Sequence, residues 1–323
     1  MTDRPNPLTE IQMTTLHTIP GANYWSREPV TQMDLRIGAY EEISSADVPG
    51  MTDQLVAALP GLEEHRCSVG TRGGFITRLR RGTYAAHMIE HVALELQEMI
   101  GHHAGYGRTR GTRGIGEYTL AFEHVHAGVG LRAATLALQT VQQAFAGTLT
   151  TVKPAVAELR ALAKTPPALR LHRQVLCGIT GGTARDIAHD TLTTLGGTSI
   201  ANNSALIVDV APAYILQAGL PYSQSDIAII LDTTLTDVPE WYRDPERAAR
   251  LVAVVADAVS PSGWVICPDD APDVHSWAQK AGCRIVPFKQ SDDPTERTHR
   301  AAQAAFTCLA QVSTPTTAHY DER

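Results

Sequence analysis

The strongest chemical signal in the sequence is the pentapeptide His87-Met-Ile-Glu90-His91. In a helix, two histidines four residues apart lie one turn apart on the same face, so both imidazoles can bind one tetrahedral Zn²⁺ ion. Glu90 lies beside His91 and can reach a water at the metal, which is the arrangement of the inverted zinc-peptidase motif. The spacing predicts Zn²⁺, or another divalent ion, held by His87 and His91, with Glu90 as general base.

Such a site needs a third protein ligand and an open coordination position. We expect Glu123, at the end of a strand predicted over residues 118–123, to be that ligand. Three other residues are alternatives: His65, Glu95 and His124. A competing interpretation is that the histidines and the glutamate form a solvated helix face or a hydrogen-bonded network without a metal.

A second group of candidate residues lies in the glycine-rich segment 105–116. Arg108 and Arg110 are flanked there by glycines, and their guanidinium groups can bind a carboxylate, a phosphate or a developing oxyanion. The alternative is a basic, solvated loop. A nucleophilic Cys67 activated by His65 is a weaker hypothesis, because a lone cysteine is more often a small buried side chain.

The motif must be carried by a long helix, predicted over residues 84–100 with Thr83 as N-cap and Gly101 after its end. Around it we expect strands over 33–43 and 118–123 and helices over 53–59 and 130–146. This pattern indicates an α+β domain.

A different pattern follows the segment 153–173, where two prolines, Pro166 and Pro167, interrupt a helical stretch. Short apolar strands then alternate with amphipathic helices, which indicates a parallel α/β sheet. The expected strands are 174–180, 205–210, 226–231, 263–267 and 284–288, and the expected helices are 245–258, 273–281 and 295–309. We therefore expect domains over residues 1–165 and 166–312 and a flexible tail over 313–323.

The composition limits the classes of partner. The net charge of −7 provides no basic field for nucleic acid or an anionic membrane. No apolar run is long enough to span a bilayer. The five cysteines are scattered and the first residues are polar, so we expect a cytoplasmic protein with reduced thiols.

Several runs in the first half together resemble the N-terminal domain of cyanophycin synthetases. They are Ala22–Arg27, Leu59–Ser68, Gly73–Phe75, Gly82–Gln97 and Gly105–Arg110. In that family the domain helps to bind the Asp–Arg polymer, and in some members it carries a metal-dependent hydrolytic site. The resemblance places the family's H-x-x-E-H motif on His87, Glu90 and His91. It also implies a homodimer or a higher homo-oligomer.

The second half resembles the Mur-ligase-like domain of the same family, with a degenerate phosphate loop. Gly181 and Gly182 remain, but Arg185 stands at the position of the phosphate-binding lysine and Asp186 at the position of the Mg²⁺-binding hydroxyl. An ATP-grasp domain has no room between the two halves. The resemblance therefore implies that ATP is not used.

The expected function is a metal-dependent hydrolase that cleaves cyanophycin-like polymer or a related amide or isopeptide. The alternative is a non-catalytic pseudoenzyme that binds the polymer or regulates a cyanophycin-type synthetase. Metal content and polymer cleavage distinguish the two.

Overall fold

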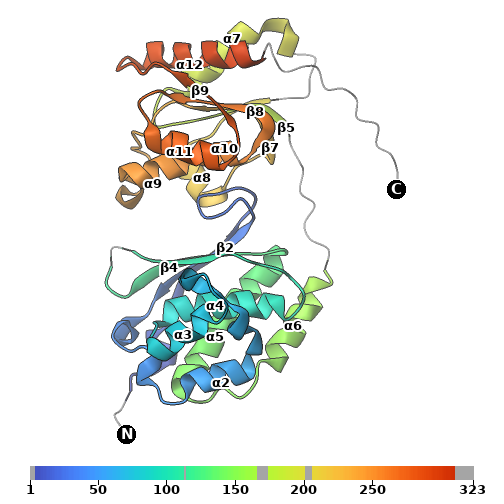
Figure 1. The fold of residues 1–323 in the computed structure, drawn as a ribbon, viewed down its shortest axis with the longest axis vertical. Helices are drawn as coiled ribbons and strands as arrows, with labels where there is room; N and C mark the ends of the chain where they lie inside the picture. Colours follow the sequence, from blue (N-terminus) through green and yellow to red (C-terminus); the bar gives the residue numbers. More distant parts are fainter. Residues whose placement is uncertain (1–3, 113, 166–173, 201–205, 310–323) are drawn as a thin grey trace. The chain divides into compact units, whose positions relative to one another are not determined.

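The structure is a computed structural model that describes residues 4–112, 114–165, 174–200 and 206–309. It divides into two compact units (Figure 1). Residues 4–20 and 28–165 belong to the first unit, and residues 21–27 and 174–309 belong to the second.

The first unit is built on a four-stranded antiparallel sheet. In spatial order its strands are β1 (Gln12–Ile19), β2 (Val30–Arg36), β4 (Glu117–Glu123) and β3 (Gly107–Gly111). Its helices are α1 (Pro7–Glu10), α2 (Met51–Ala58), α3 (Gly74–Arg81), α4 (Ala85–Glu98), α5 (Ala127–Ala146) and α6 (Lys153–Ala163). Short 3₁₀ turns connect them: η1 (Gly38–Glu41), η2 (Ser45–Asp47), η3 (Pro60–Glu64) and η4 (Cys67–Val69).

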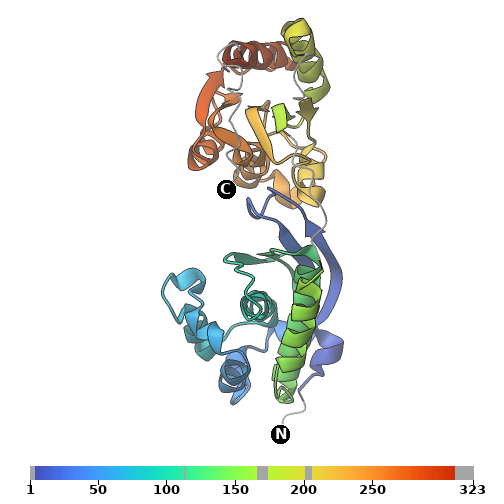
Figure 2. The same cartoon turned by 90° about the vertical axis from the view of Figure 1, so that its right-hand side faces the viewer.

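Alternation along the strands gives this sheet one apolar and one polar face. Leu35, Leu120 and Phe122 are buried in the core with α4 and α5, which lie on the same side of the sheet (Figure 2). The alternate residues of β2 and β4, such as Asp34 and Thr119, face the opposite side of the sheet. On that polar face the hydroxyl of Thr119 donates a hydrogen bond of 2.6 Å to Asp34.

Helix α4 is the central element of the first core. Twelve of its fourteen residues are buried, including four polar ones, Glu90, His91, Glu95 and Gln97. Its N-cap position is Tyr84, which forms no side-chain cap, so packing rather than capping stabilises the helix. The hydroxyl of Thr83, the expected N-cap, instead lies 2.9 Å from Nδ1 of His87.

The second unit is a five-stranded parallel sheet. Its spatial order is β6 (Leu206–Asp209), β5 (Gln174–Thr180), β7 (Gln224–Ile230), β8 (Val259–Pro268) and β9 (Arg284–Phe288). Helices α7 (Arg185–Ile200) and α12 (Pro294–Leu309) cover one face (Figure 1). On the other side lie α8 (Pro212–Ala218), α9 (Pro245–Val252), α10 (Val254–Asp257) and α11 (Pro272–Lys280), with η5 (Glu240–Arg243) before α9.

The expected combination of an α+β first part and a parallel α/β second part is confirmed. Several segments differ from expectation: the strand expected over 33–43 ends at Arg36, and the helix expected over 245–258 is divided into α9 and α10. The glycine-rich segment with Arg108 and Arg110 contains strand β3 rather than a continuous loop. Residues 21–27 group with the second unit, where Arg27 Nε donates to Asp257 at 2.9 Å and Leu220 N donates to the carbonyl of Ala22.

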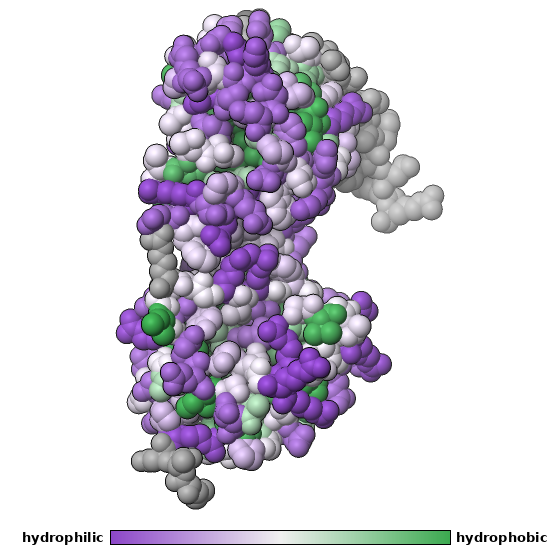
Figure 3. Space-filling view, turned by 60° about the vertical axis from the view of Figure 1, so that its left-hand side comes forward, coloured by the Kyte–Doolittle hydropathy of each residue, from purple (hydrophilic) through white to green (hydrophobic). Residues whose placement is uncertain are grey.

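Among the described residues, no helix combines the length and the apolar character needed to cross a membrane. The face drawn in Figure 3 is mainly hydrophilic, with isolated hydrophobic side chains. The expected tail over 313–323 and part of the expected domain boundary lie outside the described residues.

Candidate metal and acid–base site

The two histidines of the motif lie one turn apart on α4 and face a cavity of about 1010 Å³. The segment 64–68, Arg78 of α3 and residues 104–109, which lead into and form part of strand β3, supply much of the remaining wall. His91 is buried, whereas His87 is half-buried and more accessible. The cavity therefore reaches the imidazoles directly, as an open metal site requires.

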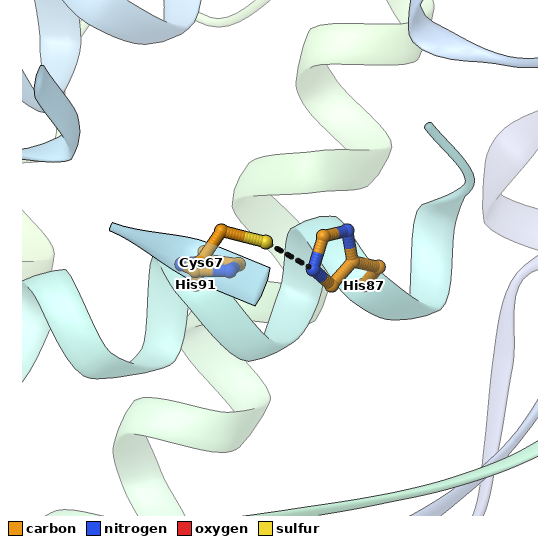
Figure 4. Close-up of side chains that lie close together, drawn as sticks. All are labelled: Cys67, His87 and His91. Carbon is orange, nitrogen blue, oxygen red and sulfur yellow. Dashed lines mark hydrogen bonds between the residues drawn. The ribbon is translucent and has the colours of Figure 1, made fainter. Parts of the chain in front are cut away.

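Cys67 supplies a third donor that the sequence-based ligand set did not include. Its sulfur lies 3.4 Å from Nε2 of His87, and donor atoms of Cys67, His87 and His91 all fall within 4.8 Å of one another (Figure 4). Cys67 adopts a left-handed backbone conformation, with a φ of 52°. Two imidazoles and a thiolate are ligands that Zn²⁺ prefers in tetrahedral sites.

Each histidine is oriented through its other ring nitrogen. Thr83 lies against Nδ1 of His87, which leaves Nε2 toward Cys67. Nδ1 of His91 lies 2.8 Å from Nδ1 of His65, whose Nε2 lies 3.2 Å from Glu95. Contacts of this kind fix ring orientation around metals. His65 and Glu95, two of the alternative third ligands, are thus placed behind His91.

Burial sets the charge state of these imidazoles. Desolvation, followed by the nearby charge of Arg78, lowers the pKa of His87 to about 4. Desolvation also moves the pKa of His91 well below its usual value, with smaller contributions from His87, His65 and Arg78. Both rings are therefore neutral near pH 7, which is the protonation state that binds a metal.

Glu90 is a buried carboxyl beside the two histidines and is only 5% exposed. Burial raises its pKa to about 7, against the opposing effects of a Thr109 hydrogen bond and the charges of Arg108 and Arg78. Thr109 donates that bond to Oε2 at 2.5 Å. A Cβ atom at Gly107 would come within 2.8 Å of Glu90, so a glycine is required for this approach. A carboxyl poised near neutrality is suited to general acid–base catalysis.

Glu123, the expected third ligand, lies outside this arrangement. Phe122 faces the core and α4, so the next residue of β4 projects from the opposite face of the sheet. Among the described residues, the cavity wall includes Cys67, His65 and Glu95 but not Glu123. His124 also lies elsewhere, with its Nδ1 3.0 Å from the hydroxyl of Thr31.

The two expected arginines of β3 also differ in whether they line the cavity. Arg108 lines the cavity, whereas Arg110 is paired with Thr119 on the polar sheet face and does not line the described cavity wall. Arg78 of α3 is the basic residue at the cluster: its guanidinium donates 2.9 Å to Ser68 and lies 3.9 Å from the Cys67 sulfur. From the sequence alone, Arg78 resembles the neighbouring surface arginines.

In the segment of the second unit where a degenerate phosphate loop is expected, an internal carboxylate occupies the hydrogen-bond donors. Asp232, which follows β7, accepts hydrogen bonds from the backbone of Gly182 at 2.9 Å and of Thr234 at 3.0 Å. Thr183 donates to the same carboxylate, and Arg297 of α12 pairs with it at 3.2 Å. These are the groups with which a loop would bind phosphate.

The substituted loop residues also turn inward. The Arg185 guanidinium donates to the carbonyl of Gly181 at 2.6 Å, so it binds its own loop. Ala184 keeps a left-handed backbone, with a φ of 59°. A phosphate at this loop would compete with Asp232 for the same donors and be repelled by its charge. The described residues therefore do not fit a nucleoside triphosphate.

Comparisons with known proteins match the first unit. The family described as cyanophycin synthase-like N-terminal domain matches residues 32–146. Cyanophycin synthetases from Synechocystis sp. and Trichormus variabilis are 45% identical over 124 residues and 43% identical over 129 residues. The matches cover 38% and 39% of this chain but only 14% of either relative. The matched family region contains α4, β3 and β4.

We expect the full chain to bind one Zn²⁺ ion through Cys67, His87 and His91. Replacing Cys67 or His87 with alanine removes a ligand, so the dissociation constant should rise at least tenfold in a chelator-competition titration. Glu123→Gln should leave it unchanged, because that side chain faces the other side of the sheet. Loss of zinc in Glu123→Gln with retention in Cys67→Ala would reverse the assignment.

The Asp232 network predicts a stability effect in the second unit. Asp232→Ala leaves Arg297, whose side chain is only 11% exposed, without its carboxylate and should lower the free energy of unfolding by about 3 kcal/mol. All four tryptophans (Trp25, Trp241, Trp264 and Trp277) lie in this unit, so their fluorescence during urea unfolding reports on it. The exposed Asp237→Ala is the matched control. Equal stability of the two variants would show that the network contributes little.

Proposed function

Because residues 32–146 form a cyanophycin synthase-like N-terminal domain, we propose that the first unit is a metal-dependent hydrolase of cyanophycin-like Asp–Arg polymer or a related amide or isopeptide. One observation carries the proposal. Donor atoms of Cys67, His87 and His91 converge in the same cavity as the buried carboxyl of Glu90. A purely structural cluster would not need a wide cavity beside it.

The donor set fits a zinc-type ion. Two neutral imidazoles and one cysteine can fill three positions of a tetrahedral site, and the cavity leaves the fourth for water or substrate. When bound, such an ion supplies Lewis acidity, which makes water more acidic and a carbonyl more electrophilic. The remaining chemistry belongs to the side chains of this chain.

Glu90 is the proposed general base and acid. Its carboxylate takes a proton from the attacking water and then delivers it to the leaving amine, so the carboxylate is regenerated when the amide bond breaks. Thr109 holds Oε2, and Gly107 allows β3 to approach, so the carboxyl is kept in one orientation. Because its pKa lies near 7, both transfers are accessible at neutral pH.

Arg78 and Arg108 are the proposed anion-binding residues. Both line the cavity and both influence the charge of Glu90, so they lie within electrostatic reach of the reacting groups. They can bind a substrate carboxylate or stabilise the tetrahedral oxyanion. Arg110, the other expected residue, has a position that favours contact with polymer outside the cavity.

The charges around the cavity support a substrate that carries both signs. Arg66, Arg78 and Arg108 line it together with Glu64 and Glu98. A polymer with carboxylates and guanidinium groups can form complementary pairs with such a wall. No ATP is needed for hydrolysis, in keeping with the occupied loop donors of the second unit.

For the second unit we propose a non-catalytic role on a degenerate Mur-ligase-like fold. In this proposal it supports a homodimer or a higher homo-oligomer of a cytoplasmic protein. Because the chain is acidic, nucleic acid and membrane surfaces are not its partners.

Glu90→Gln tests the hydrolase directly. It removes the proton-accepting carboxylate while preserving the shape of the side chain, so cleavage of purified cyanophycin by the zinc-loaded chain should fall about 10²–10⁴-fold. Zinc stoichiometry should be unchanged. Product release is followed by separating soluble Asp–Arg fragments from the polymer, without ATP. Glu123→Gln is the control and should cleave at the wild-type rate.

Two outcomes would contradict the proposal. If Glu90→Gln cleaves the polymer at the wild-type rate, the carboxylate of Glu90 is not the general base. A zinc-loaded wild-type chain that binds the polymer but leaves its length unchanged would favour the non-catalytic binding protein.

A further inference from the structure

Strand β3 is the last strand of its sheet and also forms part of the cavity wall. One edge of β3 pairs with β4, and the sheet order places no strand of the described chain on the other edge. Residues 105–109 line the cavity. The sheet therefore ends beside the Cys67–His87–His91 cluster and Glu90.

The register shows which backbone groups point outward. Glu123 N donates to the carbonyl of Tyr106, and Thr112 N donates to the carbonyl of Glu117. In an antiparallel pair, alternate residues direct both backbone groups toward the partner strand. Tyr106 and Thr112 thus bond toward β4, as do the two arginines between them, whereas Gly107, Thr109 and Gly111 point theirs toward the open edge.

The residues whose backbone groups point toward the open edge are small, and at Gly107 and Thr109 this is because their side-chain positions lie against Glu90. The side chain of Thr109 is turned toward Glu90, and a side chain at Gly107 would collide with Glu90 and Leu94. The larger Arg108 and Arg110 occupy the intervening positions, whose Cβ atoms point to the opposite sheet face, and of the two only Arg108 contributes to the described cavity wall. No bulky side chain of β3 therefore stands between its open edge and the catalytic candidates.

From this juxtaposition we propose that the open edge of β3 binds the backbone of an extended, charged polyamide chain as an added strand. Gly107, Thr109 and Gly111 provide alternate N–H donors and C=O acceptors for that chain, the common mode of β-strand addition. The flanking Arg108 and the mixed charges of the cavity favour a chain with acidic and basic side chains.

This docking mode places a substrate amide next to Glu90. Glu90 contacts β3 through Thr109 and Gly107, so a strand paired with these residues passes the carboxyl and the metal-binding cluster. The assignment of the reacting bond rests on the proposed hydrolase. The pairing itself does not, since it can be measured as binding without any reaction.

Proline substitution tests the pairing while preserving the ladder with β4. A proline is tolerated on an edge strand where its missing N–H faces outward. Gly111→Pro removes an outward donor, and Gly111→Ala is its control, because the added Cβ would meet only Tyr118 at 3.9 Å. Thr109→Pro is matched by Thr109→Val, since both lose the hydroxyl bond to Glu90 and only the proline loses the N–H.

Binding is measured with the full chain and purified cyanophycin in the presence of a chelator, so that no metal-dependent cleavage occurs. We expect each proline variant to bind at least fivefold more weakly than its control, with unchanged circular dichroism and zinc stoichiometry. Equal binding within both pairs would overturn the inference.

The two proposals fail separately. If wild type cleaves the polymer and both proline variants bind like their controls, the hydrolase stands and strand addition is wrong. If the proline variants bind more weakly and wild type does not cleave, β3 remains the docking strand and the hydrolase is wrong.

Discussion

Burial of a helix that carries two histidines and the buried carboxyls of Glu90 and Glu95 is the constraint on which the first unit depends. Water is excluded from most of α4, so each polar atom must find a protein partner or lose its charge. Thr83, His65 and Thr109 each engage one atom of the motif. The same burial keeps the imidazoles neutral and raises the pKa of Glu90 to about 7. The packing that holds the helix thus also prepares its side chains for chemistry.

The motif could be predicted because helical spacing is local, whereas the third ligand could not. His87 and His91 share a face of any helix that contains them. The position of Cys67 depends on the left-handed turn at η4, on the packing of this turn against α3 and on the contact with His87 of α4, 20 residues away in the sequence. Glu123 was a reasonable carboxylate at a strand end. The alternation of β4, fixed by the buried Phe122, turns it to the other face.

Strand β3 and the contacts of Asp232 are two further features that depend on residues distant in the sequence and could not be predicted from local patterns. Glycines weaken strand propensity, so residues 107–111 are typical of a loop until pairing with β4 makes them a strand. In the second unit, continuous apolar runs identify the buried parallel strands, and β5 and β9 match the expected bounds. The contact of Asp232 with Gly182 depends on β7 lying next to β5, which the order of elements along the chain does not specify.

The buried polar groups of the two units differ in whether other groups of the protein satisfy them, and this difference indicates which unit binds a ligand. In the second unit, the backbone donors near Gly182 and the charge of Arg297 are satisfied by one internal carboxylate, so an external anion has little to gain there. In the first unit, the sulfur of Cys67 lies 3.4 Å from Nε2 of His87 and 3.9 Å from the Arg78 guanidinium, beside a wide cavity. Two neutral imidazoles and a sulfur that face a cavity keep electron pairs with which they can bind a metal ion. A ligand is therefore expected at the cavity of the first unit, where electron-pair donors converge, rather than at the loop of the second unit.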